Sequence, residues 1–271
     1  MVVARHMRRT GCALTVAGLS AIYLACMSPW SQLLGRFVWR ARTDEKVVAL
    51  TFDDGPNEPF TTQILDLLDT HGAVGTFFMV GRNAERCPDV VRRIARSHHE
   101  LGNHSYRHQF RRYFAGSRSF LDEIGSTQAL FDRLVHVEPR LFRPPWLYRT
   151  RGILRAVEAE GLRSIGGEFC HLLEVFQPRA GRIAVATLRK LRPGSIIIFH
   201  DGFNGSQGVD RTQTVRAVGL VVRALADQGW QMVSVSELLR RTEGTAGTRS
   251  SPVPDFVSSR MSGEDGKWTS L

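Results

Sequence analysis

Residues 47–56, Val-Val-Ala-Leu-Thr-Phe-Asp-Asp-Gly-Pro, decide the fold that the sequence predicts. The apolar first half is typical of a buried strand, and the Gly-Pro pair at the end is typical of a turn. Two adjacent carboxylates, Asp53 and Asp54, therefore stand where a buried strand ends. Like charges in a low-dielectric site resist joint ionisation, so this arrangement is costly without a counter-charge. A bound cation would supply that counter-charge.

Two histidines further along the chain are the candidate ligands for such a cation. His104 and His108 lie in Gly-Asn-His-Ser-Tyr-Arg-His, residues 102–108, at the end of another short β-rich run. One aspartate and two neutral imidazoles make a three-ligand site with open positions, which is typical of a catalytic rather than a structural metal. The other aspartate would then be free to act as a base. Either motif alone also fits an ordinary turn or a surface histidine pair, so the prediction depends on their combination.

The composition allows one domain with appendages and limits the classes of partner. The chain has 271 residues, 42% of them apolar, and a net charge of +10 that comes almost wholly from arginine. Such a charge can attract nucleic acid or anionic polymers. No nucleic-acid motif or basic–aromatic stripe occurs, so we expect no nucleic-acid partner. The arginine excess fits either a GC-rich genome or attraction to anionic cell-wall glycans. The absence of Cys-x-x-Cys argues against a cysteine-bound zinc.

The N-terminal region, residues 1–45, is predicted to hold a cytoplasmic stub, a membrane anchor and a linker. Residues 11–30 carry no charge and follow several arginines, and a run of this length can cross a bilayer. Leu24-Ala25-Cys26 is similar to a bacterial lipobox, but Tyr23 stands where an aliphatic residue is expected, and no Ala-x-Ala cleavage pattern follows. We therefore expect an uncleaved anchor, with a cleaved signal peptide as the alternative.

From residue 46 onward the sequence alternates between two kinds of segment. Short β-rich runs occupy 46–52, 74–80, 99–104, 140–143, 162–166, 195–200 and 230–235, with amphipathic stretches of helical spacing between them. This alternation predicts an α/β fold with a parallel sheet. Asp53, His104, Arg143 and His200 lie at the ends of four different runs, and a closed barrel brings such strand ends to one mouth. After Arg241 the periodicity stops, and we expect a disordered tail over 242–271.

Four motifs, in order, resemble the polysaccharide deacetylase family, also called the NodB-homology domain or carbohydrate esterase family 4. They are Thr-Phe-Asp-Asp-Gly-Pro (51–56), His-Ser-Tyr-Arg-His (104–108), Arg-Pro-Pro-Trp (143–146) and Ile-Phe-His-Asp-Gly (198–202). The resemblance spans about residues 45–240 and implies an irregular (β/α)7 barrel, with a catalytic domain over 46–241. Because members of this family mostly act on surface glycans, the resemblance also implies that the catalytic domain lies outside the cytoplasm.

The resemblance implies roles for the residues of the first three motifs. Asp54, His104 and His108 would hold a divalent metal, with Zn2+ expected first and Co2+, Ni2+ or Mn2+ as alternatives. Asp53 would be the catalytic base. Arg143 would pair with Asp53 and keep it ionised and oriented, because an adjacent cation favours the charged carboxylate.

The last motif and the arginine motif supply the other implied site residues. His200 would be the general acid that protonates the departing amine. Ile198 would line an apolar pocket for the acetyl methyl group. Trp146, with Pro145, would wall the sugar cleft. The backbone N–H of Trp146 is a candidate oxyanion donor, because a proline offers none.

The family's fourth motif, an Asp-Trp pair whose aspartate tunes the acid histidine, is absent. Aligned on the following Gln-Pro, Glu174 falls on the position of that aspartate. Glu174 would then hydrogen-bond His200 and raise its pKa, because a carboxylate partner favours the charged imidazolium. His171 and Glu168 are competing candidates for the same position.

The sequence thus predicts a membrane-anchored, metal-dependent hydrolase that removes N-acetyl groups from an extracytoplasmic glycan such as peptidoglycan or a chitin-like oligomer. An O-acetyl esterase, or a deacylase of a lipid-linked sugar, could use the same metal chemistry. A catalytically silent glycan-binding domain would not need the intact set of site residues. A non-haem iron oxygenase also uses two histidines and a carboxylate, but its carboxylate normally lies close to the first histidine in an all-β fold.

Overall fold

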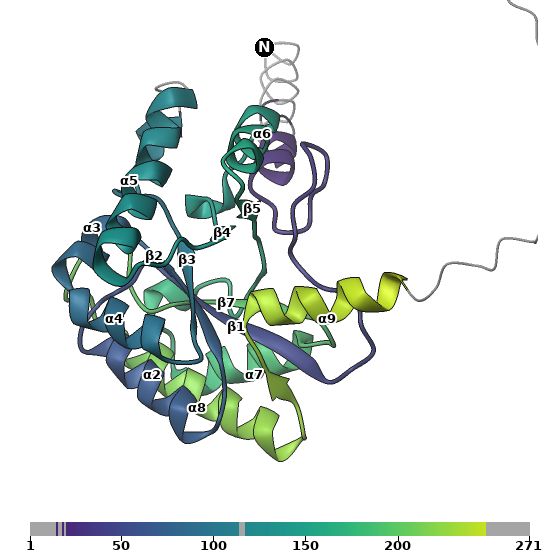
Figure 1. Cartoon of the computed structure of the whole chain (residues 1–271). Coiled ribbons are helices and arrows are strands. Elements are labelled where there is room, and N and C mark those ends of the chain that lie inside the picture. Colours follow the sequence, from purple (N-terminus) through teal and green to yellow (C-terminus); the bar gives the residue numbers. More distant parts are fainter. Residues whose placement is uncertain (1–14, 16–17, 19, 114–116, 248–271) are drawn as a thin grey trace, which may run out of the picture.

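The protein is described by a computed structural model that covers residues 15, 18, 20–113 and 117–247 (Figure 1). Its centre is a parallel sheet of eight strands in the order β5-β4-β3-β2-β1-β7-β6, with β8 paired to β1. The strands are β1 Val47–Asp53, β2 Gly75–Met79, β3 Glu100–Asn103, β4 Leu141–Phe142, β5 Arg163–Ser164, β6 Glu168–Phe169, β7 Ile196–His200 and β8 Gln231–Met232. Each of the seven predicted runs contains a strand, and β6 is an addition.

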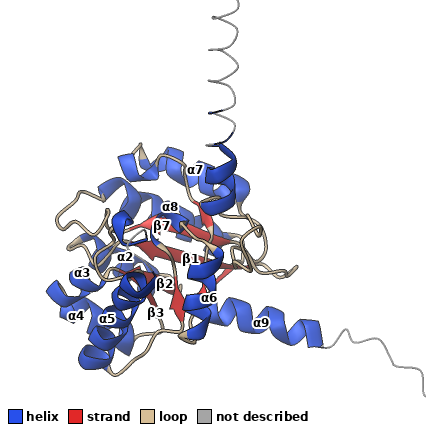
Figure 2. Ribbon diagram, turned by 90° about the horizontal axis from the view of Figure 1, so that it is seen from above, coloured by secondary structure: helices blue, strands red, loops and turns tan. Residues whose placement is uncertain are grey.

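Helices cover the sheet and connect its strands (Figure 2). They are α2 Phe60–Thr70, α3 Gly81–Arg86, α4 Pro88–Arg96, α5 Ser117–Val135, α6 Arg151–Ala159, α7 Ala180–Lys190, α8 Thr212–Asp227 and α9 Val235–Gly247. The short α3 and the C-terminal α9 were not predicted. Residues 242–247 are helical rather than irregular, because Leu238 and Leu239 anchor α9 in the core and the hydroxyl of Thr242 donates to the carbonyl of Leu238.

The sheet is a half-barrel rather than a fully hydrogen-bonded closed barrel. Its path ends at β5 and β6, and no pairing within the described residues joins those two strands. The strands β4, β5 and β6 have only two residues each, which leaves little backbone for a continuous ladder. Part of the N-terminal linker lies at this seam: Val38 bridges to Ile165, and Arg40 bridges to Ser195. The linker therefore belongs to the folded domain.

Only part of the predicted membrane anchor lies within the described residues. Residues 1–14, 16–17 and 19 lie outside the described residues, whereas residues 20–26 form a helix. Within the described part of the chain, no helix has both the length and the apolar character needed to span a bilayer.

Alternate side chains of β1 face different parts of the core. Val48, Leu50 and Phe52 pack against the helices on the outer face, together with residues of α2, α4, α7 and α8. Val47 and Ala49 face the interior of the half-barrel, where α9 packs. This period of two places the last residue of the strand, Asp53, on the interior face as well.

The strand register brings the functional residues to one edge. Asp53 lies opposite His200 on β7 and Phe78 on β2, and Met79 lies opposite Asn103 on β3. Because all these strands run parallel, the loops that follow them leave from the same end of the sheet.

The turn after β1 is held by Asp201, which directly follows β7. The Asp201 carboxylate accepts a hydrogen bond of 2.6 Å from the hydroxyl of Thr61, and its carbonyl accepts one from Asn57. A Cβ on Gly55 would lie 2.0 Å from Asp201 Oδ2. Only glycine fits this close approach, which explains the residue type in the Asp-Asp-Gly-Pro turn.

We predict that Gly55→Ala destabilises the fold by about 1–3 kcal/mol, the usual cost of overpacking a filled core. Thermal or denaturant unfolding measures the change. Gly125→Ala is the matched control, because Gly125 lies exposed inside α5 with no atom within 4 Å of an added Cβ. That substitution should raise stability by about 0.5–1 kcal/mol. Equal effects of the two substitutions would contradict the packing argument.

Candidate active site

The ion pair between Arg143 and Asp53 is fully buried at the end of β1. Arg143 Nη1 lies 2.6 Å from Asp53 Oδ1 and also donates to the hydroxyl of Thr51 at 2.7 Å. Arg143 Nη2 donates to the carbonyl of Gly166, and the guanidinium lies 4.0 Å from the ring centroid of Phe78. Burial lowers the pKa of Arg143, whereas the charge of Asp53 opposes that shift. The predicted pairing of Arg143 with Asp53 is confirmed.

Asp54 points away from that pair, towards two histidines. Its Oδ1 lies 3.0 Å from His108 Nε2 and 3.5 Å from His104 Nε2. The three potential ligand atoms lie within 4.8 Å of one another, and all three residues are buried. The structure therefore separates the two carboxylates: Asp53 pairs with an arginine, and Asp54 faces the imidazoles.

The backbone and the charges around Asp54 explain how adjacent aspartates can diverge. Asp54 adopts a φ of 75°, which turns its side chain away from the direction of the strand. The amide of Asn204 donates to Asp54 Oδ2 at 2.9 Å, and Asn83 donates to its carbonyl. Burial raises the pKa of Asp54, but the hydrogen bonds and charges of His108 and His104 outweigh that effect and hold the pKa well below its usual value.

The two histidines present suitable atoms for a metal. His104 Nδ1 lies 2.7 Å from the carbonyl of Arg143 and can donate to it, so Nε2 is the ring atom that faces Asp54 and would be the one to bind a metal. His108 also directs Nε2 to Asp54, and its buried Nδ1 has no hydrogen-bond partner among the described residues. A carboxylate oxygen and two imidazole nitrogens, all turned to one point, fit a divalent cation.

His200, at the end of β7, is held from behind by Glu174. His200 Nδ1 lies 2.8 Å from Glu174 Oε2, and the other Glu174 oxygen accepts from the hydroxyl of Thr214. Burial alone lowers the pKa of His200, but the hydrogen bond and charge of Glu174, with the charges of Asp54 and Asp53, raise it to about 9. The predicted contact between Glu174 and His200 is confirmed.

The competing candidates for this contact lie elsewhere. Glu168 accepts hydrogen bonds from Arg192 and Ser195. His171 lines the cleft, and its Nδ1 accepts from the amide of Leu173.

One cavity of about 360 Å³ is lined by Asp53, Asp54, His104, His108 and His200. Trp146 lines it, with a φ of 55° and with its ring 4.3 Å from that of His108. The backbone N–H of Trp146 has no hydrogen-bond partner within the described residues. The next two backbone amides donate to the carbonyls of Pro144 and Pro145. Ile198 does not reach the cavity surface, because it is buried beneath Leu147 and Phe169, which line the cavity instead. Pro145 is likewise buried and does not line the cavity.

The N-terminal segment forms part of the same cavity, which the sequence gave no reason to expect. Tyr23 and Met27 line it together with Asp53, Asp54 and His200. A fully buried arginine, Arg149, fastens this segment: its guanidinium donates to the carbonyls of Ser28 and Ser31, and its amide donates to that of Cys26. Arg149 lies outside every recognised motif, so no local signal marked its role.

An aspartate and two histidines gathered at the carboxyl ends of the strands of a half-barrel, beside a second aspartate and a further histidine, fit the class of metal-dependent hydrolases. The sequence model of the polysaccharide deacetylase family matches residues 40–165. A peptidoglycan-N-acetylglucosamine deacetylase of Bacillus cereus is 33% identical over 207 residues, which cover 76% of this chain and 94% of the relative. A chitooligosaccharide deacetylase of Sinorhizobium fredii is 30% identical and covers 74% of this chain and 96% of the relative. The chain belongs to the polysaccharide deacetylase family.

Solved structures show the same fold. A crystal structure of a peptidoglycan N-acetylglucosamine deacetylase matches with a TM-score of 0.70 and 28% identity, covering 75% of this chain and 92% of that one. A family pseudoenzyme from Bacillus anthracis also matches, with a TM-score of 0.67, 22% identity and coverage of 75% of this chain and 69% of that one. Since that likeness shows the fold alone, activity must be argued from the residues of the site.

We predict that Glu174→Gln lowers the pKa of His200 by about 1–3 units, because the substitution removes a carboxylate that favours the charged imidazolium. Titration of the His200 ring by NMR in the metal-free protein measures the shift. Glu168→Gln is the control and should leave the pKa unchanged, since Glu168 contacts Arg192 and Ser195 instead. A shift in Glu168→Gln with none in Glu174→Gln would show that Glu168, and not Glu174, is the glutamate that raises the pKa of His200.

Proposed function

We propose that this protein is a metal-dependent deacetylase that removes N-acetyl groups from an amino-sugar glycan. The observation that carries the proposal is the division of the two adjacent carboxylates. Asp53 is paired with Arg143, while Asp54 faces His104 and His108. A silent binding domain has no need for this separation of a base from a metal-binding triad.

The triad suits a divalent cation, and Zn2+ is the first choice because it is commonly bound by two histidines and a carboxylate with open positions. Co2+, Ni2+ or Mn2+ fit the same donor set. Asp54, His104 and His108 would hold the ion. When bound, it would polarise the substrate carbonyl and lower the pKa of water.

The remaining groups supply proton transfer on two sides of the reacting amide. Asp53, oriented by Arg143, takes a proton from the water whose oxygen attacks the acetyl carbonyl carbon. His200, protonated over the neutral range with the help of Glu174, donates a proton to the sugar nitrogen as the carbon–nitrogen bond breaks. The products are acetate and a free amine on the sugar. The unpartnered amide of Trp146 is suitably placed to donate to the developing oxyanion.

The relatives support a glycan as the substrate class. They are named for peptidoglycan N-acetylglucosamine and for chitooligosaccharides. In this chain Trp146 offers an aromatic wall in the cleft beside His108. An O-acetyl ester would undergo the same attack, and one relative is named a bifunctional xylanase/deacetylase. O-deacetylation is therefore the second candidate. The deacylation of a lipid-linked sugar is a third candidate on the same scaffold.

We predict that the purified protein releases acetate from N-acetylglucosamine oligomers, with a mass loss of one acetyl group for each turnover. Mass spectrometry on a panel of N-acetylated and O-acetylated glycans measures the product. Chelation should abolish the activity, and divalent metal should restore it. Turnover of the O-acetylated members alone would replace the amidase proposal with an esterase.

Variants separate the proposed roles in the same assay. Asp53→Asn should retain bound metal and lose about 10²–10⁴-fold in kcat, the usual contribution of a general base. Asp54→Ala and His104→Ala should lose metal and activity together. Normal metal content in Asp54→Ala, measured by elemental analysis, would contradict the division of the carboxylates.

The proposed location is the outer face of a membrane, with the N-terminal stretch as the anchor. Support comes from the uncharged run over residues 11–30 and from the lack of a convincing cleavage site. We predict that the native protein stays in the membrane fraction after alkaline carbonate washing and has an intact N-terminus by mass spectrometry. A soluble mature protein that starts near residues 26–29 would instead mean a cleaved signal peptide.

A further inference from the structure

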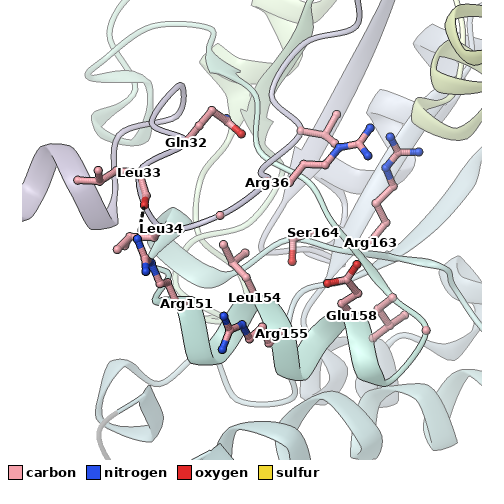
Figure 3. A pocket seen from close by; sticks show the side chains of 14 residues that line it. Gln32, Leu33, Leu34, Arg36, Arg151, Leu154, Arg155, Glu158, Arg163 and Ser164 are labelled. Carbon is pink, nitrogen blue, oxygen red and sulfur yellow. Dashed lines mark hydrogen bonds between the residues drawn. The ribbon is translucent and has the colours of Figure 1, made fainter. Parts of the chain in front are cut away.

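A second cavity, separate from the catalytic cleft, lies between the N-terminal linker and α6 (Figure 3). Its volume is about 670 Å³, and it shares no lining residue with the cleft. Residues 32–38 form one wall, α6 forms a second, and residues 161–164 around β5 form the third. No role in the proposed deacetylation reaches this part of the molecule.

The cavity is strongly basic. Arg36, Arg151, Arg155 and Arg163 line it, with Glu158 as the one acidic residue among the lining residues. Within the described part of the chain, none of Arg36, Arg151 and Arg155 forms an ion pair, and all three are exposed. The positive charges around this cavity repel one another, and a bound anion would offset that repulsion. The ligand that fits is therefore anionic, and arginine suits phosphate because its planar guanidinium can bind two oxygens at once.

The linker wall is fixed rather than loose. The side-chain amide of Gln32 donates to the carbonyl of Phe37 at 2.8 Å and accepts from its amide at 2.9 Å. Gly35 has a φ of +139°, and a Cβ there would lie 3.0 Å from Leu154 of α6. Arg149 lies over the ring of Phe37 at 4.1 Å. The cavity is thus pre-organised, so binding there would not have to order the loop first.

The surroundings of the cavity favour a membrane lipid over a soluble anion. The linker wall follows closely on the uncharged run of residues 11–30, in which residues 20–26 are helical. Leu33, in the wall itself, is 68% exposed, and Trp30 is 59% exposed. An exposed tryptophan and leucine beside a basic pocket are typical of a surface that meets the lipid headgroup layer, where amphipathic rings and arginines both find partners.

We propose that this cavity, named the arginine pocket, binds the phosphate of an anionic phospholipid headgroup. Arg36 from the linker and Arg155 from α6 line opposite sides of the pocket, with Arg163 near Arg36 and Arg151 on α6 (Figure 3). Trp30 and Leu33 lie against the lipid side. The bound headgroup holds this face of the domain against the membrane, whether residues 11–30 form an uncleaved anchor or not. The proposal does not depend on the deacetylase reaction.

The test uses the full chain in a neutral detergent and a soluble short-chain lipid. Dihexanoyl phosphatidylglycerol should bind with measurable heat in calorimetry, and dihexanoyl phosphatidylcholine should bind far more weakly. The double substitution Arg36→Gln/Arg155→Gln should weaken phosphatidylglycerol binding by on the order of 30-fold, about five-fold for each arginine. Raising the salt concentration should weaken binding of the anionic lipid in the unsubstituted protein as well.

Arg216→Gln/Arg223→Gln is the matched control, because it removes two positive charges from the exposed side of α8, remote from α6 (Figure 1). It should leave lipid binding unchanged. Equal affinity for the two lipids, or an equal loss in the control, would overturn the proposal. Tighter binding of soluble poly(glycerol phosphate), lost in the pocket variant, would overturn it in favour of a polymer ligand. If the double variant fails to fold, the comparison of phosphatidylglycerol with phosphatidylcholine on the unsubstituted protein still tests the proposal.

Discussion

Two adjacent carboxylates buried at the end of β1 are the constraint on which the site depends. Asp53 and Asp54 could not both remain charged in a dry interior without separate counter-charges. The fold supplies them from different directions, Arg143 for Asp53 and the two histidines for Asp54. The positive φ of Asp54 makes this possible, because it turns consecutive side chains to different neighbours. Removing one member of such a buried pair costs about 3–5 kcal/mol, so fold and function share these contacts.

The turn after β1 holds the two aspartates in these positions. Asp201 fills the space left by Gly55 and holds Asn57, while Gly202 lies against the backbone of Asp54, where a Cβ would meet the carbonyl oxygen at 2.4 Å. The ends of β1 and β7 therefore support each other, and Asp53 and His200 stand opposite one another as a consequence. The sheet alone fixes the separation of these two side chains, and a sheet positions side chains more rigidly than a loop does.

The N-terminal linker connects the catalytic cleft with the arginine pocket. Tyr23 and Met27 lie in the cleft, residues 32–38 line the pocket, and Val38 and Arg40 bridge at the seam of the half-barrel. Arg149 makes this possible, since one buried guanidinium satisfies carbonyls that a non-regular segment would otherwise leave unpaired. Residues from the predicted membrane anchor line the cleft and residues from the predicted linker line the pocket, so this part of the chain contributes to both cavities.

The sequence by itself determined the alternation of strands and helices, the parallel sheet and the identity of the triad, because these depend on local periodicity and on motifs with fixed spacing. It also indicated Glu174 as the partner of His200. Tertiary structure decided what local patterns do not encode. The strands β4, β5 and β6 are too short to close the barrel, Ile198 is covered by Leu147 and Phe169, and α9 continues past residue 241 because its apolar face meets the core. The places of Tyr23, Met27 and Arg149 depend on contacts between segments more than a hundred residues apart, and no pattern within either segment records such contacts.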